Sequence, residues 1–269
     1  MLKNYTLLLI LSLFLFAACV TTKPQYRNDA TLGQYPESKA VTTSFLLIGD
    51  SGYAQAGEST EGLLTLKNFL MSEEYTPDYT IFLGDNIYPD GMPKKGDKDR
   101  DLAEHRLNVQ LDAVRENSGQ VIFIPGNHDW YNEGLDGLER EEKYLKNNLD
   151  QKEVLLPENG CPLVSMDINE QVHLLIIDTQ WYLADWDDHP KINDKCDEIK
   201  TREKFFIELE NEVKKNQDKT ILLAMHHPMI TNGVHGGKFA INKHLYPSQK
   251  RVPLPVLASL VTQIRTQGG

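Results

Sequence analysis

The sequence predicts an α/β fold in which several strands end in polar side chains. Short runs of β-branched and large apolar residues alternate with longer stretches of helical periodicity, which is the pattern of βαβ units. Near the end of four such apolar runs stand the polar residues Asp50, Asp85, Asn127 and His226. Loops converge over the carboxyl ends of parallel strands, so we expect these side chains to meet. With 269 residues, 40% of them hydrophobic, the chain can bury a full core.

The first half of the chain supplies three strands and two helices. Apolar runs at residues 45–49, 79–83 and 121–124 are the expected strands. The helix over about residues 60–73 is predicted by a stripe of apolar side chains: Leu63, Leu64, Leu66, Phe69 and Leu70. A second amphipathic helix is expected over residues 101–117. Strand and helix alternating at this spacing predict parallel pairing.

The second half repeats these signals. We expect a helix at 135–148, strands at 162–168 and 172–177, a charged helix at 200–216 and a last strand at 220–224. The charged helix is expected to turn its apolar residues inward: Phe205, Phe206, Leu209 and Val213.

Residues 1–43 indicate export and a tether. Lys3 precedes an apolar run from Leu7 to Ala18, and Cys19 follows. The run is short for a membrane span of about 20 residues. It resembles a bacterial lipoprotein signal over residues 1–19, in which Cys19 is lipidated; an ordinary secretory signal and an uncleaved anchor are the alternatives. The polar residues 20–43 would tether a domain of residues 44–269 to a membrane of the bacterial envelope.

Cysteine content and charge narrow the setting further. Two cysteines remain beside Cys19, namely Cys161 and Cys196. In an oxidising compartment they are expected to form a disulfide, with two buried thiols as the alternative. A net charge of −11 disfavours nucleic acid as a partner, because backbone binding needs a clustered basic surface.

Five motifs carry side chains suited to two metal ions. They are Asp50 in IGDSG, Asp85 and Tyr88 in FLGDNIY, Asn127 and His128 in IPGNHD, His226 in LLAMHHP, and His235 in GVHGG. Each motif alone also suits a turn or a helix cap. Together, their oxygen donors, amide and imidazole indicate a hydrolytic dinuclear centre rather than a closed structural zinc site.

These motifs resemble the calcineurin-like metallophosphoesterase superfamily and, within it, the purple acid phosphatases. The patterns D-x-G, G-D-x-x-Y, G-N-H and a strand-end V-x-x-H are met, in order, by Asp50–Gly52, Gly84–Tyr88, Gly126–His128 and Leu223–His226. The resemblance runs from Asp50 to about His235. It implies a four-layer α/β/β/α sandwich, two sheets face to face with helices outside.

The resemblance also implies a ligand set. Asp50 and Tyr88 would bind the first metal, Asp85 would bridge, and Asn127 and His226 would bind the second. A phenolate suits a strongly acidic ion, so the pair implied is Fe(III) with a divalent Fe, Zn or Mn. The other reading of Tyr88 is an aromatic ring packed beside a turn.

Histidines complete the expected site. By the resemblance, His128 and His235 contact substrate oxygens and assist the leaving group, although His235 also reads as an exposed loop histidine. His227 is the alternative ligand to His226, and Asp129 could orient the imidazole of His128. Without a motif around them, four others are expected to be structural or exposed: His105, His173, His189 and His244.

The function implied is hydrolysis of phosphate monoesters by a metal-bound hydroxide. The alternatives are a phosphodiesterase or nucleotidase using Mn, Zn or non-purple iron, and a membrane-tethered interaction module without catalysis. The closing G-H-x-H of the family is missing between His235 and Gly269. This suggests a chain that lacks its C-terminal portion and continues in a longer protein, or a natural domain with an open metal site.

Overall fold

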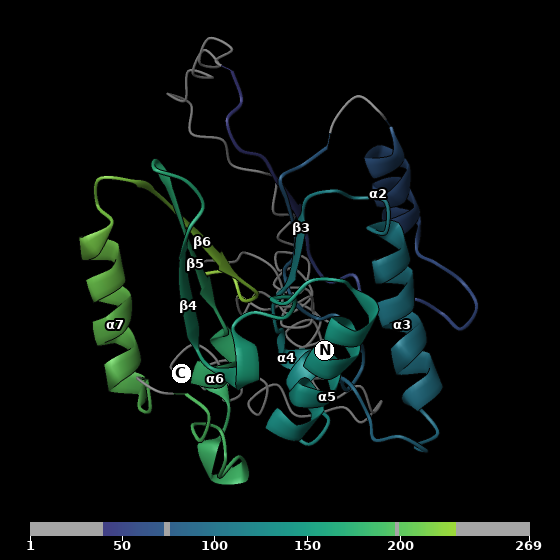
Figure 1. The fold of residues 1–269 in the computed structure, drawn as a ribbon. Coiled ribbons are helices and arrows are strands. Elements are labelled where there is room, and N and C mark those ends of the chain that lie inside the picture. The colour runs from purple at the N-terminus through teal and green to yellow at the C-terminus, as the bar shows by residue number, and fades with distance from the viewer. Residues whose placement is uncertain (1–39, 73–75, 197–198, 230–269) are drawn as a thin grey trace, which may run out of the picture. The chain divides into compact units, whose positions relative to one another are not determined.

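The computed structural model describes residues 40–72, 76–196 and 199–229. The chain divides into two compact units, residues 1–42 and 43–269, and the fold below is that of the second unit (Figure 1). The expected signal with Cys19, most of the tether, His235 and His244 lie outside the described residues.

The first sheet holds three parallel strands, as the alternation of elements predicted. It consists of β1 (Phe45–Ile48), β2 (Tyr79–Phe82) and β3 (Gln120–Phe123), in that order. Ile48 pairs with Phe82, and Phe82 with Phe123. The three strands therefore end level with one another, and the loops that follow them leave from the same edge.

The second sheet is mixed. It consists of β4 (Leu163–Asp167), β5 (Val172–Ile177) and β6 (Thr220–Met225), in that order. The short link between β4 and β5 makes that pair antiparallel, whereas β5 and β6 are parallel and joined through a helical crossover.

The two sheets share an apolar core. Ile81 and Ile122 of the first sheet lie in one buried cluster with Leu174 and Ile176 of the second. On the far side of the first sheet, a second cluster joins Phe82 and Phe123 to the helices α2 (Glu61–Met71), α3 (Arg100–Ala113) and α5 (Leu135–Asn148). The helix α7 (Arg202–Lys215) packs beside β4 (Figure 1). This is the expected four-layer α/β/β/α order.

Two helices bury a narrower stripe than the sequence predicted. In α2, Leu63, Leu66 and Leu70 are buried, but Leu64 and Phe69 are 49% and 40% exposed. In α7 only Phe205 is buried, Leu209 is partly buried, and Phe206 and Val213 are exposed. Each helix covers its sheet with one face only, so the apolar residues that flank that face stay in water.

Four short helices were not predicted, because three to five residues are too few to show a period. They are α4 (Asn127–Trp130), the 3-10 turn η1 (Glu158–Gly160), α6 (Thr179–Leu183) and the 3-10 turn η2 (Trp186–Asp188). The expected disulfide joins Cys161 to Cys196, with their Cα atoms 5.5 Å apart. Among the described residues, no helix has the length and apolar character needed to cross a membrane.

Candidate metal centre

The ligand-type side chains stand just beyond four strand ends. Asp50 follows β1, Asp85 follows β2, Asn127 opens α4 after β3, and His226 follows β6. Asp50 and Asp85 have φ angles of 54° and 55°, a left-handed backbone that is uncommon for residues other than glycine. Non-glycine residues held in this conformation cluster at functional sites, at a cost of about 1–3 kcal/mol each.

Glycines let the loops approach closely. A Cβ atom on Gly126 would lie 2.3 Å from Asp85 Oδ1, and one on Gly84 would lie 2.7 Å from His226 Nδ1. Larger residues at these two positions would therefore push the motifs apart. The glycines of G-D-x-x-Y and G-N-H thus serve packing between the loops.

Three of the predicted residues could hold one cation together. Carboxylate oxygens of Asp50 and Asp85 and an imidazole nitrogen of His226 lie within 4.8 Å of one another. His226 Nε2 is 3.3 Å from Asp85 Oδ1 and 3.2 Å from Asn127 Oδ1. The structure therefore brings Asp50, Asp85, Asn127 and His226 into one site.

The hydrogen bonds leave a group of acceptors facing each other. His226 Nδ1 lies 2.8 Å from the carbonyl oxygen of Leu83, which can only accept, so Nδ1 carries the proton. In the neutral ring Nε2 is then an acceptor, and it faces the oxygens of Asp85 and Asn127. The amide of Asn127 has its oxygen on this side, and its Nδ2 donates to the Tyr131 hydroxyl at 2.6 Å. A cation, or a second proton on His226, is needed to satisfy the three.

The charges of Asp50 and Asp85 also favour a bound cation at this site. Within the described part of the chain, Asp50 and Asp85 form no ion pair with a lysine or arginine. The nearby guanidinium of Arg106 donates instead to the carbonyl oxygens of Ala54 and Tyr88. Asp85 is 3% exposed, and a buried carboxylate without a counter-ion is costly. Hard oxygen donors with one imidazole fit a divalent or trivalent cation.

Tyr88 lies at the site as a phenol. Its hydroxyl donates to Asp50 Oδ1 at 2.9 Å. Burial, followed by the hydrogen bonds and charges of Asp85 and Asp50, raises the pKa of Tyr88 above its ordinary value of 10.0. A phenolate ligand would therefore require a cation strong enough to outweigh both carboxylates.

His128 also reaches the site. Its backbone N–H donates to Asp85 Oδ1 at 3.0 Å, and its Nε2 lies 3.9 Å from Asp85 Oδ2. Its Nδ1 contacts the carbonyl oxygen of Pro89, which assigns the proton of the neutral ring to Nδ1. The ring centroid is 4.3 Å from that of Tyr88. The side chain is 27% exposed, so part of the ring is open to solution.

The expected role of Asp129 was wrong. Its carboxylate does not hold the imidazole of His128 but accepts backbone N–H groups of Gly126 at 2.8 Å, Asn86 at 2.9 Å and Ile87 at 3.0 Å. The reason is local: Asp129 is the third residue of α4, and its side chain folds back over the start of that helix. It thereby ties the loop after β2 to the loop after β3.

Asn86 and Glu141 extend this tie into the helical layer, and no motif had pointed to them. Asn86 Nδ2 donates to the carbonyl oxygen of Ile124 at 3.0 Å and to Glu141 Oε1 at 3.1 Å. Asn86 Oδ1 and Glu141 Oε2 are buried without a hydrogen-bond partner. Burial raises the pKa of Glu141 well above 4.5, with the charge of Asp129 adding to it, and burial raises that of Asp129 to about 7.

A second buried acid anchors the other sheet. Asp178 follows β5 and caps α6, accepting the backbone N–H of Trp181 at 3.1 Å. It also accepts the indole N–H of Trp130, in α4, at 2.9 Å. Burial raises its pKa to about 7. His227 contacts Thr179 Oγ1 of α6 at 2.7 Å, so it is His226 that faces Asp85.

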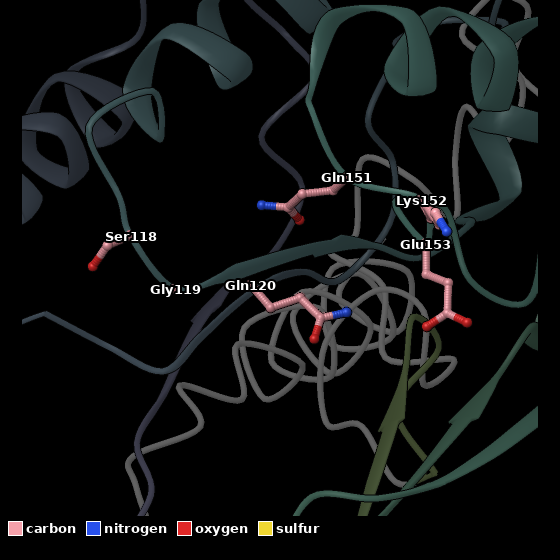
Figure 2. A pocket seen from close by; sticks show the side chains of 6 residues that line it. All are labelled: Ser118, Gly119, Gln120, Gln151, Lys152 and Glu153. Carbon is pink, nitrogen blue, oxygen red and sulfur yellow. The ribbon is translucent and has the colours of Figure 1, made fainter.

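The hollow in Figure 2 lies elsewhere. It measures about 480 Å³ and sits at the amino end of β3, where Gln120 and Gln151 line it with four neighbours: Ser118, Gly119, Lys152 and Glu153. The metal-ligand candidates stand at the opposite, carboxyl ends of the strands. This hollow is therefore separate from the candidate metal centre.

Comparison with known families decides the class. The family model described as calcineurin-like phosphoesterase matches residues 43–252, well over half of the chain. The chain belongs to the calcineurin-like phosphoesterase family. The group of Asp50, Asp85 and His226 lies within the matched residues.

Other comparisons are more distant. Among solved structures, one match is a Plasmodium protein described as "GAP50 the anchor in the inner membrane complex of Plasmodium", at 17% identity and a TM-score of 0.43. The alignment covers 82% of this chain and 63% of that one, so this chain spans less than two thirds of that structure's length. No curated protein matched the chain.

Three histidines of this calcineurin-like phosphoesterase lie outside the centre, as expected. His105 contacts the carbonyl oxygen of Glu58, His189 packs edge-on against Trp130, and His173 is buried beside Asp167. Each has a structural partner, and none belongs to the acceptor group.

Proposed function

We propose that this chain hydrolyses phosphate monoesters, as acid phosphatases do, with two metal ions at the candidate centre. The observation that carries the proposal is the meeting of Asp85 Oδ1, Asn127 Oδ1 and His226 Nε2, three atoms that a cation could bind together. Beside them, Asp50 and Tyr88 supply a carboxylate and a phenol joined by a hydrogen bond. Two adjoining sets of potential metal ligands that share one carboxylate suit a pair of cations.

In this proposal Asp50 and Tyr88 would hold the first ion, Asn127 and His226 would hold the second, and Asp85 would serve both. Bound cations would polarise the phosphoryl oxygens and acidify a water molecule. The chain positions its donors in advance, since the Leu83 carbonyl fixes the ring of His226 and the backbone N–H of His128 holds the carboxylate of Asp85.

His128 is the proposed acid. When its ring is protonated, Nδ1 stays on the Pro89 carbonyl and the proton on Nε2 is available for the oxygen of the departing alcohol. His235, the second proposed assistant, lies outside the described residues. His128→Gln should lower turnover more for esters of poorly acidic alcohols than for esters of acidic phenols, which need less protonation.

The identity of the two metals distinguishes the proposed phosphatase from its alternative. Fe(III) with a divalent Fe, Zn or Mn is proposed from the tyrosine in the second motif. The alternative is a phosphodiesterase or nucleotidase with Mn, Zn or non-purple iron, and the phenol of Tyr88, hydrogen-bonded to Asp50, is compatible with either choice. Visible absorption of the iron-loaded chain separates them: a tyrosinate-to-iron band lost in Tyr88→Phe supports the iron pair.

The test of the function is metal content and turnover measured on the same sample. Two bound ions with hydrolysis of a monoester, and slower hydrolysis of the matching diester, support the monoesterase. Faster diester hydrolysis supports the alternative. No bound metal and no turnover would instead support the non-catalytic interaction module.

We also propose that the chain is exported and anchored to a membrane of the bacterial envelope through lipidated Cys19. The support is the Lys3, apolar run and cysteine order of residues 1–19. Cys19→Ser should move the protein from the membrane fraction to the soluble fraction. An unchanged distribution of this variant would contradict the anchor.

A further inference from the structure

Four aromatic rings form a continuous row along the candidate centre. The ring centroids of Tyr53 and Tyr88 are 5.8 Å apart, those of Tyr88 and His128 are 4.3 Å apart, and those of His128 and Tyr131 are 4.8 Å apart. The two inner rings touch the carboxylates: Tyr88 donates to Asp50, and His128 Nε2 lies 3.9 Å from Asp85. The row therefore passes directly beside the place proposed for the phosphoryl group.

The two outer rings are exposed yet held in place. Tyr53 is 60% exposed, while Tyr88 contacts one side of it and the guanidinium of Arg106 lies 5.6 Å from its ring centroid. Arg106 itself is fixed by its hydrogen bonds to the carbonyl oxygens of Ala54 and Tyr88. The ring of Tyr53 thus loses little freedom when a flat molecule stacks on it.

Tyr131 is fixed differently. It is 52% exposed, it meets the ring of His128 in an edge-on contact, and its hydroxyl accepts from Asn127 Nδ2 at 2.6 Å. Fixing the hydroxyl leaves one aromatic surface open to solvent beside a proposed metal ligand. Single exposed aromatic residues are common on protein surfaces. Several exposed aromatic rings grouped at one site indicate a binding surface.

The position of the rings beside the proposed phosphoryl site indicates which kind of ester group they would contact. A phosphoryl group at Asp50, Asp85 and His226 would place its ester substituent near this row of rings. Neither exposed tyrosine carries a charge that would select a sugar acid or an amine. Stacking on an aromatic side chain favours a flat ring by about 1–3 kcal/mol.

We propose that Tyr53 and Tyr131 are specificity-determining residues that stack on an aromatic group in the leaving alcohol. The preferred substrates would be phosphate esters carrying a flat ring, either an aryl phosphate or a nucleoside phosphate. This inference rests on the proposed function, whose substrate class it narrows.

The experiment compares ratios of kcat/KM on the metal-loaded full chain. The substrates are phenyl phosphate, adenosine 5′-monophosphate and glycerol 3-phosphate, and the variants are Tyr53→Ala, Tyr131→Ala and Tyr131→Phe. We expect one or both alanine variants to lower the ratio of ring-bearing ester to glycerol phosphate by about 5- to 150-fold. Tyr131→Phe keeps the ring and should keep the ratio, even if the loss of its bond to Asn127 slows all three substrates alike.

Matched controls separate stacking from general damage. Phe206, which is 53% exposed on α7, gives the control variant Phe206→Ala, whose ratio should equal that of the unaltered chain. Comparison of kcat/KM for phenyl phosphate with kcat/KM for the nucleotide shows whether aryl or nucleoside phosphates are the better substrates. If both alanine variants keep the original ratios while turnover continues, the stacking proposal is wrong and the proposed function stands.

Binding of inert analogues covers the case without turnover. Calorimetry on the metal-loaded chain compares phenylphosphonate with methylphosphonate, and we expect tighter binding of the phenyl compound, lost in Tyr53→Ala or Tyr131→Ala. That result in a protein that hydrolyses nothing would uphold the aromatic site and reject the proposed function. Equal binding of the two phosphonates would overturn the aromatic site.

Discussion

The two ends of the strands treat acidic residues in opposite ways. At the amino end of β5 and β6, Asp167 is 2.6 Å from Lys219 Nζ and 2.6 Å from His173 Nδ1, so the chain supplies a lysine cation and a hydrogen-bonding imidazole. At the carboxyl end, Asp50 and Asp85 form no ion pair with lysine or arginine among the described residues. Behind them, Asp129, Glu141 and Asp178 are buried at 0% exposure.

The pKa shifts follow the same division. The hydrogen bond from Lys219, and then that from His173, lower the pKa of Asp167 below 3.8. Burial raises the pKa of Asp129 and of Asp178 to about 7. The carboxyl end therefore holds buried acids whose pKa values are raised, behind Asp50 and Asp85, which have no lysine or arginine partner among the described residues. The difference supports the proposal that this end binds a cation from outside the chain.

The largest expected effect comes from removing one charge at each end. Asp85→Asn keeps an oxygen for the His128 N–H but removes the charge between the proposed ions, so metal affinity and turnover should fall by more than about 100-fold. Asp167→Asn is the matched control and should leave both unchanged. Metal content after dialysis and kcat/KM for a monoester give the answer. Full metal loading in Asp85→Asn would contradict the claim that Asp85, unlike Asp167, binds a metal ion.

Glu141 tests whether the buried acids are neutral. Glu141→Ala removes an acceptor of Asn86 Nδ2 and leaves a cavity, so we expect a loss of about 2–4 kcal/mol in the free energy of unfolding. Glu141→Gln should change it by less than about 1 kcal/mol, because burial raises the pKa of Glu141 and so favours an uncharged side chain of this shape. Urea denaturation of both variants measures this. Equal losses in the two would show that the charge of Glu141 is used.

The pH dependence of stability should carry the sign of the raised pKa values. Between the ordinary value of 3.8 and about 7, the folded state holds a proton on Asp178 that the unfolded state releases. Its contribution to stability is present below that window and is lost as the pH rises through it, by about 4 kcal/mol for the metal-free chain. Asp178→Asn should flatten this slope, whatever it does to the stability at any one pH. An unchanged slope would contradict a neutral Asp178.

The smallest expected effect has the opposite sign. Because Lys219 and His173 lower the pKa of Asp167, its contribution is present above about 3.8 and is lost as the pH falls below that value. Thermal midpoints between pH 2.5 and 5 should fall less steeply in Asp167→Asn than in the unaltered chain, and by less than the Asp178 effect. If Asp167→Asn changed the pH dependence of the thermal midpoint near neutral pH instead, the contrast between the two ends of the strands would be contradicted.

Much of the fold was predictable because its signals are local. Apolar runs and strand-end motifs located the six strands to within two residues, and the positions of Asp50, Asp85, Asn127 and His226 placed them at the correct ends. The parallel order of the first sheet followed from the alternation of elements.

What failed depended on contacts between distant segments. Burial of Glu141 within a charged helix is decided by Asn86, 55 residues away, and no pattern in either segment announces it. The exposure of Phe206 depends on how much of the sheet α7 covers. Asp129 was given the wrong partner because a four-residue helix, invisible to periodicity, turns its side chain onto the backbone.

The most direct test of the central claim is anomalous diffraction from crystals of the chain grown with Mn²⁺. The account predicts anomalous peaks beside Asp85 and within coordination distance of His226 or Asp50, and none beside Asp167. Crystals that show no peak at Asp85, or a peak only at the amino end of the strands, would contradict the claim that the carboxyl end is built for a cation.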